Sequence, residues 1–307
     1  MCAFWAAIGE CQANPGYMKL KCAPSCQTCD MIDINVRCPP LSEDVEPALR
    51  PGGLNAMFER IVATAPGNNT NIDLAEGMTN YSVVVHSRPE STMVIDKAMD
   101  LQQPPWLITF NNFLTDEECE TLIQLGHKSE YERSKDVGAV QTDGSYDSIV
   151  SKSRTSENAW CSYQKNCRNE EVPKRIHERI MTVTGIKTNH SEDFQMLRYE
   201  PGQFYRRHHD YIEMQADRRC GPRILTFFLY LNDVEEGGAT NFPLLDIAVT
   251  PKKGAAVLWP SVLNYNPKEK DHRTDHEAQD VIKGIKYGAN AWLHLHDYLA
   301  ATEMGCT

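Results

Sequence analysis

The chain has 307 residues, of which 41% are hydrophobic and 24% are charged, so it can bury a sizeable core. This length suits one domain of roughly 200 residues with a smaller appendage. The net charge is −11, the pI is about 5.4, and no run of Lys or Arg is present. Binding to nucleic acid phosphates, which needs a basic face, is therefore disfavoured, and no stretch approaches a membrane span.

The cysteines predict a disulfide-bonded module at the N-terminus. The chain has eleven, and six fall in the first 38 residues: Cys2, Cys11, Cys22, Cys26, Cys29 and Cys38. This density in a stretch poor in strand-forming residues is typical of small secreted folds. Zinc bound by Cys26 and Cys29 is an alternative, weakened by the lack of a second close pair or a nearby histidine. We expect a separate module over residues 1–38.

The cysteines and three Asn-x-Ser/Thr sequences indicate the endoplasmic reticulum lumen or secretory pathway. These possible glycosylation sites start at Asn68, Asn80 and Asn189. No signal peptide is visible, because the apolar stretch from Ala3 to Ile8 is too short, and the C-terminus is not a retention signal. We expect that the natural chain begins further upstream.

Residues 39–100 predict a linker that becomes the edge of the following domain. Proline and glycine interrupt this stretch repeatedly. Between them, Leu54 to Ile61 could form a short helix, and Tyr81–Val85 and Thr92–Ile95 are candidate strands.

Residues 101–300 are expected to form the main domain. Its first part predicts a strand at Pro105–Phe110, a helix capped by Thr115, a polar loop from Asp136 to Ser151 and a helix from Val172 to Thr184. The threonine hydroxyl can accept from first-turn amides, and Gly185 suits the end of the second helix. We also expect a disulfide between Cys161 and Cys167, with free thiols as the alternative.

From Phe194 onward, short alternating strands are separated by glycines, as in a double-stranded β-helix, or jelly roll. The candidate strands are Gln195–Tyr199, Arg223–Asn232, Ala255–Trp259 and Ile285–His294. The predicted fold is therefore mainly β with flanking helices (α+β): a jelly-roll domain plus the small disulfide-rich module.

A possible iron site begins at His208 and Asp210. Two histidines and one carboxylate form the facial triad that holds iron(II), and residues two apart lie on one side of an extended segment. His276 is the candidate third ligand, expected from a strand opposite in the barrel. His209 should point the other way, toward packing or substrate, and His272 has no basic residue ten positions later. Alone, a His-x-Asp pair could arise by chance among ten histidines.

Lys286, ten residues after His276, indicates that a cosubstrate binds next to the metal site. It shares strand parity with Trp292 and His294, so one face should present all three. A buried ammonium needs an anionic partner, and 2-oxoglutarate could provide it. The 2-oxo acid end would chelate iron and the far carboxylate would reach Lys286, with a hydroxyl added by Thr240. A solvated strand lysine is the alternative.

Several segments share one family pattern. They are Tyr199–Asp210, Arg223–Thr226, Asp233–Thr240, His276 and Val281–Lys286. Together they resemble the catalytic domain of prolyl 4-hydroxylases of the collagen and plant or algal cell-wall type, from about Pro105 to about Tyr298. The family often has His-x-Gly-x-Pro-Val at the distal histidine, whereas this chain has His276-Glu277-Ala278-Gln279-Asp280-Val281. This difference could alter the rim of the site.

The N-terminal module resembles a ShK toxin-like domain, although the family's first cysteine has no counterpart. The resemblance implies the pairings Cys2–Cys22 and Cys11–Cys26. Cys29 is then left to Cys38 or to a cysteine upstream of this sequence. The sequence does not indicate the pairing of Cys119, Cys220 and Cys306.

The resemblance to prolyl 4-hydroxylases implies hydroxylation of peptidyl proline at C4, coupled to oxidative decarboxylation of 2-oxoglutarate to succinate. It implies Fe(2+), O2 and L-ascorbate, and a proline-rich or collagen-like polypeptide as substrate. Tyr205, Arg223, Trp292 and His294 would line the peptide groove, and Tyr199 would lie near the cosubstrate. Ordinary core packing, or a surface ion pair for the arginine, is the alternative.

Two other functions remain open. One is a 2-oxoglutarate oxygenase acting on another peptidyl side chain such as lysine; a nucleobase is disfavoured by the acidic charge. The other is a secreted binding module with an inactive oxygenase fold, against which the intact triad speaks. The sequence indicates neither the oligomeric state nor the particular substrate protein.

Overall fold

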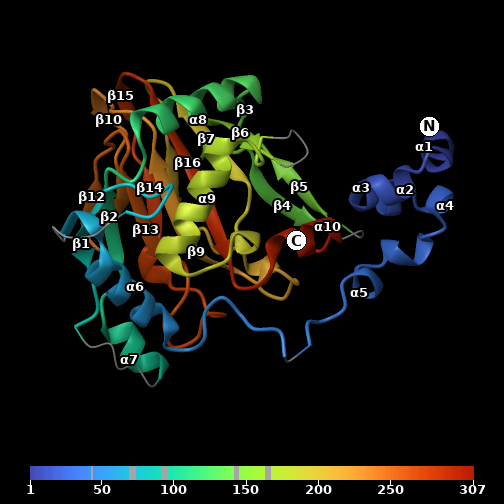
Figure 1. Ribbon diagram of the computed structural model, residues 1–307, viewed down its shortest axis with the longest axis horizontal. Coiled ribbons are helices and arrows are strands. Elements are labelled where there is room, and N and C mark those ends of the chain that lie inside the picture. Colours follow the sequence, from blue (N-terminus) through green and yellow to red (C-terminus); the bar gives the residue numbers. More distant parts are fainter. Residues whose placement is uncertain (43, 69–73, 91–95, 142–144, 163–166) are drawn as a thin grey trace.

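A computed structural model describes residues 1–42, 44–68, 74–90, 96–141, 145–162 and 167–307. The main body has two packed antiparallel sheets with helices over one of them, and short N-terminal helices lie to one side of it (Figure 1). The predicted mainly-β architecture with flanking helices is confirmed. Within the described ranges, no helix is both long and apolar enough to cross a bilayer.

The larger sheet has eight strands in the order β1-β2-β13-β9-β16-β7-β6-β3. Their bounds are β1 (Ser82–Ser87), β2 (Leu107–Asn111), β3 (Glu132–Arg133), β6 (Glu157–Cys161), β7 (Phe194–Tyr199), β9 (Arg223–Tyr230), β13 (Ala256–Pro260) and β16 (Lys286–His294). Every neighbouring pair is antiparallel. The strands expected from Gln195, Arg223, Ala255 and Ile285 onward correspond to β7, β9, β13 and β16, so these four predictions are confirmed.

The smaller sheet has four strands in the order β12-β11-β14-β8, and two further sheets pair β10 with β15 and β4 with β5. The bounds are β4 (Asp136–Val140), β5 (Tyr146–Ile149), β8 (Tyr205–His208), β10 (Glu236–Gly237), β11 (Thr240–Phe242), β12 (Ile247–Val249), β14 (His276–Ala278) and β15 (Val281–Lys283). The prediction of a loop from Asp136 to Ser151 is therefore wrong, because β4 and β5 form an antiparallel pair there. Strand β5 is mostly exposed, so it lacks the buried apolar alternation that identifies strands in sequences.

Alternate side chains of the central strands pack into two different cores. Phe227 and Leu229 of β9 join the core beneath the helices, whereas Phe228 and Tyr230 join the core between the two sheets. This alternation follows from the two-residue period of a strand. Both faces of the central sheet are thus covered, and the candidate site lies on the inner face.

Helices α6 (Gly53–Thr64), α8 (Asp116–Lys128) and α9 (Glu171–Thr184) pack into the core on the outer face of the larger sheet. The other helices of the main body are α7 (Lys97–Gln102) and α10 (Tyr298–Glu303), with 3-10 turns η2 (Pro66–Asn68), η3 (Thr188–His190), η4 (Glu213–Gln215) and η5 (His272–Thr274). The predicted cap of α8 is confirmed: the Thr115 hydroxyl accepts from the Glu118 amide, and the Glu118 carboxylate accepts from the Thr115 amide. Gly185 ends α9 in the left-handed conformation, as expected.

The segment before the main sheet also contributes to the core. The helix expected at Leu54–Ile61 lies within α6, and its Phe58 stacks on Trp106 with ring centroids 5.1 Å apart. The strand expected at Tyr81–Val85 is β1. The strand expected at Thr92–Ile95 lies outside the described residues.

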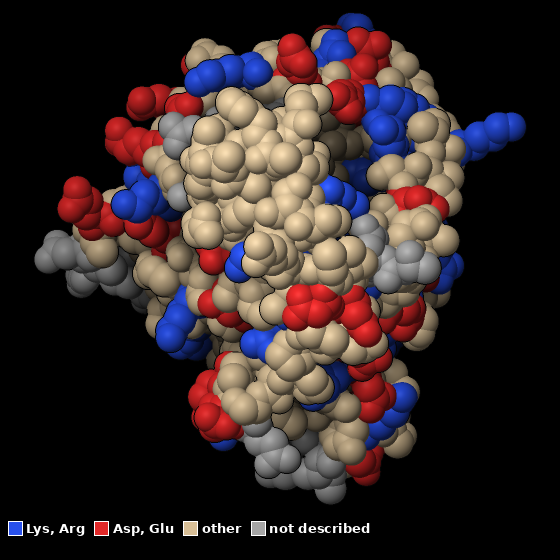
Figure 2. All heavy atoms as spheres, turned by 90° about the vertical axis from the view of Figure 1, so that its right-hand side faces the viewer, with Lys and Arg blue, Asp and Glu red and all other residues tan. Residues whose placement is uncertain are grey.

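The N-terminal module consists of short helices held by disulfides. They are α1 (Cys2–Ala7), α2 (Glu10–Ala13), α3 (Pro15–Lys21), α4 (Ala23–Cys26), η1 (Cys29–Ile32) and α5 (Ile34–Arg37). The expected bridges Cys2–Cys22 and Cys11–Cys26 are both present, and the second one rules out a zinc site at Cys26. The side of the molecule where the module lies has a broad face without charged side chains (Figure 2).

The remaining cysteines correct one expectation and confirm another. Cys38 is bonded to Cys306 near the C-terminus, not to Cys29, which is free and exposed. The sequence could not predict this bridge, because its two cysteines are 268 positions apart and meet only in the folded chain. The bridge expected between Cys161 and Cys167 is present.

Candidate iron and cosubstrate site

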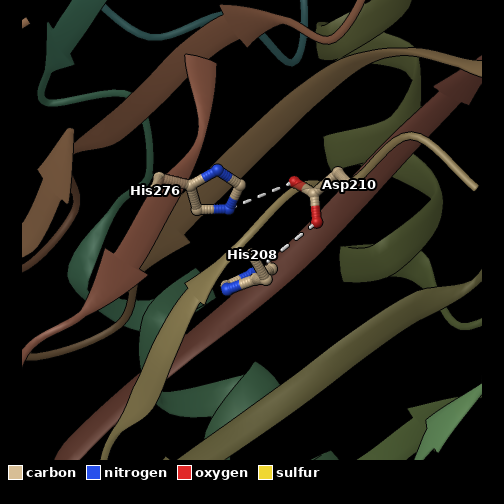
Figure 3. Close-up of side chains that lie close together, drawn as sticks. All are labelled: His208, Asp210 and His276. Carbon is tan, nitrogen blue, oxygen red and sulfur yellow. Dashed lines mark ion pairs between the residues drawn. The ribbon is translucent and has the colours of Figure 1, made fainter. Parts of the chain in front are cut away.

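The three expected metal ligands lie together. His208 ends β8 and His276 begins β14, and the two are direct partners in the antiparallel register of these strands. The third ligand candidate therefore comes from the adjacent strand of the same sheet, not from an opposite strand as expected. Asp210 lies two residues beyond β8, and one ligand atom from each of the three residues falls within 4.8 Å of the others (Figure 3).

Backbone contacts set the orientation of both imidazoles. The Nδ1 atom of His208 lies 2.9 Å from the carbonyl of Arg206, and the Nδ1 atom of His276 lies 3.0 Å from the carbonyl of Thr274. A carbonyl can only accept, so each Nδ1 must be the protonated nitrogen. Each Nε2 then keeps its lone pair and points toward Asp210, as a metal-binding histidine requires.

The Asp210 carboxylate is buried but remains a good anionic ligand. Burial by itself raises its pKa, yet His276, His208 and the guanidinium of Arg223 together hold the pKa below its usual range. The hydroxyl of Thr226 also donates to this carboxylate at 2.6 Å. Two imidazoles, one carboxylate and this supporting hydrogen bond form a donor set that suits iron(II).

An inner cavity is lined by the three ligand candidates and by Lys286. Both Lys286 and Thr240 line it together with the ligands, and so does Tyr199, as expected. Lys286 is fully buried in β16, and among the described residues no carboxylate forms an ion pair with it. Its Nζ donates to the carbonyl of Gly238 at 2.7 Å.

Aromatic rings surround the Lys286 ammonium group. Its Nζ lies 5.2 to 5.6 Å from the ring centroids of Phe228, Tyr199 and Tyr230. Burial lowers the pKa of Lys286 to about 7. The Thr240 hydroxyl, 2.7 Å from the Tyr230 hydroxyl, faces the same cavity. The pocket thus offers a cation and hydroxyl groups with no internal counter-charge, which suits a carboxylate.

A second, outer cavity of about 560 Å³ lies between the β4–β5 pair and the main body. Of the four residues expected in a peptide groove, Tyr205, Arg223 and Trp292 line it. Asp210 and Tyr205 line both cavities. The outer cavity therefore reaches the candidate metal ligands directly.

Arg223 is held in a fixed position in this cavity. Its guanidinium carbon lies 3.6 Å from the ring centroid of Trp292, in cation–π contact. The carboxylate of Glu192 accepts two hydrogen bonds from the same guanidinium, at 2.5 and 3.1 Å. Burial raises the pKa of Glu192, but Arg223 and His294 outweigh this effect and lower it to about 2.

His294, the fourth residue expected in the groove, does not line the cavity. It is fully buried, and its Nε2 contacts Glu192 at 2.7 Å while its Nδ1 contacts the carbonyl of Gly221 at 2.9 Å. The register of β16 shifts between Leu293 and His294, so strand parity does not carry through this position. His294 thus lies behind Arg223 and supports the carboxylate that holds it.

Arg154 also lines the outer cavity, although the sequence did not predict it as a site residue. Its guanidinium lies 4.6 Å from the ring centroid of Tyr205 and donates to the Gln195 side chain at 2.9 Å. Arg154 forms only an isolated bridge to Tyr205, so it belongs to no strand whose periodicity could reveal it. His209, also in this cavity, bonds the carbonyl of Asp271 and stays outside the metal cluster.

Comparison with known proteins agrees with this geometry. The family model of the 2OG-Fe(II) oxygenase superfamily matches residues 194–294, which include all three ligand candidates, and a ShK domain-like model matches residues 1–29. The chain is thus a 2OG-Fe(II) oxygenase with a ShK-like module at its N-terminus.

Curated relatives define the family more closely. The chain is 33% identical to prolyl 4-hydroxylase 2 of Arabidopsis thaliana over 74% of this chain and 80% of that protein, and 36% identical to probable prolyl 4-hydroxylase 8 of the same plant over 63% and 70%. It is 31% identical to the chicken (Gallus gallus) prolyl 4-hydroxylase subunit alpha-2 over 64% of this chain and 36% of that one. The chain belongs to the prolyl 4-hydroxylase family.

A solved structure is also similar. The viral collagen prolyl hydroxylase of Paramecium bursaria Chlorella virus-1, determined as a 2OG complex, is 26% identical with a TM-score of 0.48. The similarity covers 61% of this chain and 95% of that one.

Proposed function

We propose that this protein is a 2-oxoglutarate-dependent dioxygenase that hydroxylates peptidyl proline at C4. His208, Asp210 and His276 would hold Fe(2+), because their donor atoms cluster and both Nε2 atoms keep a lone pair. Bound iron would supply the site where O2 and the 2-oxo acid group meet. The chain's own residues hold the ligands, bind the dicarboxylate and position the peptide.

Lys286 is proposed to bind the far carboxylate of 2-oxoglutarate. Support comes from its burial in a cavity shared with the candidate metal ligands, where no carboxylate among the described residues pairs with it. The ammonium group of Lys286 has three N–H donors, so it can keep its bond to the Gly238 carbonyl and donate to the ligand as well. Thr240 would add a hydroxyl contact, and Tyr199 would form part of the wall.

The outer cavity is proposed to bind a proline-rich or collagen-like polypeptide. Aromatic faces pack well on a polyproline II helix, and Tyr205 and Trp292 provide them. Arg223 can donate to peptide carbonyls, with Glu192 and His294 behind it. The single observation that favours this function most is that the outer cavity meets the metal ligands at Asp210.

The overall reaction balances within this site. The C4–H bond of proline becomes C4–OH and 2-oxoglutarate loses carbon dioxide to become succinate; one oxygen atom of O2 enters the hydroxyproline and the other enters succinate. L-ascorbate would act as a reductant that maintains Fe(2+). The oligomeric state has no part in this proposal.

We further propose that the protein works in the endoplasmic reticulum lumen or the secretory pathway. Four disulfides in the described part of the chain support this location. Asn80 is exposed and could be glycosylated, whereas the Asn189 amide is bonded to Asp297. The proposed division is a ShK-like module at 1–38, a connecting edge at 39–100 and the oxygenase domain at 101–300.

A panel of peptides tests the proposed function against its alternatives. Purified protein with Fe(2+), 2-oxoglutarate and ascorbate should release succinate with proline-rich peptides and not with lysine-containing peptides that lack proline. Succinate release only with the lysine peptides would favour the other oxygenase activity. Peptide binding without turnover, unchanged by His208→Ala, would favour an inactive binding module.

A further inference from the structure

A free thiol lies beside the disulfide that joins the two ends of the chain. Cys220 and Cys306 are both fully buried and belong to one apolar cluster with Ala301, and Cys38 packs against it. Cys38 and Cys306 are bonded to each other, whereas Cys220 is free. Three sulfur atoms, one thiol and one disulfide, thus share a single cluster.

This disulfide attaches the N-terminal module to the main body. Cys38 directly follows α5, the last helix of the module, and Cys306 follows α10. The Arg37 guanidinium, next to Cys38, donates to the carbonyl of Gly305, next to Cys306. The thiol of Cys220 is therefore placed at the covalent connection between module and main body.

The backbone next to this thiol contacts the residues behind the outer cavity. The carbonyl of Gly221, which follows Cys220, accepts a hydrogen bond from Nδ1 of His294. Nε2 of His294 in turn bonds the Glu192 carboxylate that holds Arg223. A change in the bonding of Cys220 is thus transmitted to Arg223 through Gly221, His294 and Glu192.

We propose that Cys220 and the Cys38–Cys306 disulfide form a thiol–disulfide exchange site. The Cys220 sulfur attacks the Cys306 sulfur, the Cys220–Cys306 bond forms, and the Cys38–Cys306 bond breaks. The electron pair of the broken bond leaves with Cys38, which takes up the proton lost by Cys220. One thiol and one disulfide are present before and after, so no external oxidant or reductant is consumed.

Burial favours this intramolecular reaction over reaction with outside reagents. A buried thiol is poorly accessible to dissolved disulfides, but Cys220 and Cys306 are held in one cluster, so their effective concentration is high. Cys38 is only partly buried, so the leaving thiol can reach solvent and take up its proton. The exchange breaks the covalent bond between the module and the C-terminal segment and shifts the backbone at Gly221 that contacts His294.

Disulfide mapping of the full chain tests the exchange. Wild-type protein is incubated in mildly alkaline buffer, alkylated without reduction, digested and analysed by mass spectrometry. We expect a linked peptide pair containing Cys220 and Cys306, with Cys38 alkylated, in addition to the Cys38–Cys306 pair. Detection of the Cys38–Cys306 pair alone at all times would overturn the proposal.

A variant gives an independent readout. In Cys38→Ser, mild oxidation with glutathione disulfide should form a disulfide between Cys220 and Cys306. Both cysteines should then no longer react with the alkylating reagent. The matched control Cys38→Ser/Cys119→Ser, which removes another buried free thiol, should behave identically. Continued alkylation of Cys220, with glutathione attached to Cys306, would contradict the exchange.

The effect on substrate binding rests on the proposed function. The form bridged by Cys220 and Cys306 should have a several-fold higher KM for proline-rich peptide, because Arg223 loses part of its support. The mapping itself needs no turnover, so the two claims are separable. If the exchange occurs in protein that is inactive toward every peptide, the proposed function is contradicted and the exchange is supported.

Discussion

His208 and His276 are direct cross-strand partners in the antiparallel pair of β8 and β14. Hydrogen-bonded strands keep their register, so this pairing holds two candidate metal ligands at a fixed separation. The ring of Trp259 packs 4.7 Å from the ring of His276 and restricts it further. The site is therefore preorganised, and loss of one ligand should affect metal binding much more than folding.

Replacing Asp210 by asparagine tests the carboxylate ligand. The amide has nearly the same shape but no negative charge, so we expect Asp210→Asn to weaken Fe(2+) binding by more than about tenfold. Metal content after anaerobic equilibration measures this directly. The matched control is His209→Gln, which changes an adjacent residue outside the ligand cluster and should retain the metal. Equal metal loss in both variants would contradict the assignment.

Lys286→Met tests the cosubstrate pocket. The methionine side chain has a similar length and no charge, so the affinity for 2-oxoglutarate should fall by at least about tenfold. Metal content should stay unchanged, because Lys286 is not a ligand. Calorimetry under anaerobic conditions, with Mn(2+) in place of iron, measures the affinity for the metal and the affinity for 2-oxoglutarate. Unchanged 2-oxoglutarate affinity would place its carboxylate elsewhere.

The pH dependence of 2-oxoglutarate binding tests the same pocket independently. The pKa of Lys286 is about 7 in the ligand-free protein, and a bound carboxylate raises it by favouring the charged form. Binding above pH 7 must therefore take up a proton, so affinity should fall as pH rises, approaching tenfold per unit. Below pH 7 the lysine is already charged and this dependence should disappear. Lys286→Met should show no such slope, and a slope retained there would assign it to another group.

Glu192→Gln tests the support of Arg223. The amide cannot balance the guanidinium charge, so Arg223 should lose its fixed position over Trp292. We expect the KM for proline-rich peptide to rise by about tenfold or more, with metal binding and 2-oxoglutarate affinity unchanged. Asp193→Asn is the control, because Asp193 pairs with Arg168 and does not line the outer cavity. A change in kcat alone would contradict a role in holding the peptide.

The sequence predicted the central strands because each strand depends on a local pattern, and the three predicted ligand candidates lie together in the structure. The alternation around Phe227 and Phe228, for example, reflects one strand with two buried faces. The position of His294 could not be predicted, because a register shift in β16 breaks the parity used to place it. The same holds for the bridge from Cys38 to Cys306, which depends on where the C-terminal segment folds.

Glu118→Gln tests a buried ion pair outside the site. Glu118 bonds Arg179 with both side chains about 1 to 2% exposed, and it also caps α8. Removing its charge leaves a buried guanidinium unpaired, so the free energy of unfolding should fall by about 3 to 5 kcal/mol. Denaturant unfolding measures this loss. The control Glu171→Gln removes the exposed partner of Arg175 and should cost less than about 1 kcal/mol.

The Glu118 carboxylate should also make the stability of the folded protein sensitive to acid. Burial raises the pKa of Glu118, but the hydrogen bonds from Arg179, Thr115 and Arg175 outweigh it and lower the pKa. A lowered folded-state pKa contributes stability above the unfolded-state pKa, and this contribution is lost as pH falls through the folded-state value. Wild-type protein should therefore lose stability on acidification more steeply than Glu118→Gln. Parallel pH profiles would contradict this role.

Mass spectrometry of a proline-rich peptide after incubation with the protein, Fe(2+), 2-oxoglutarate, O2 and ascorbate tests the central claim most directly. We predict a mass increase of one oxygen atom, located on proline by fragmentation, that requires 2-oxoglutarate and is absent with Asp210→Asn. An unmodified peptide under these conditions, or an oxygen atom located on another side chain, would contradict the account.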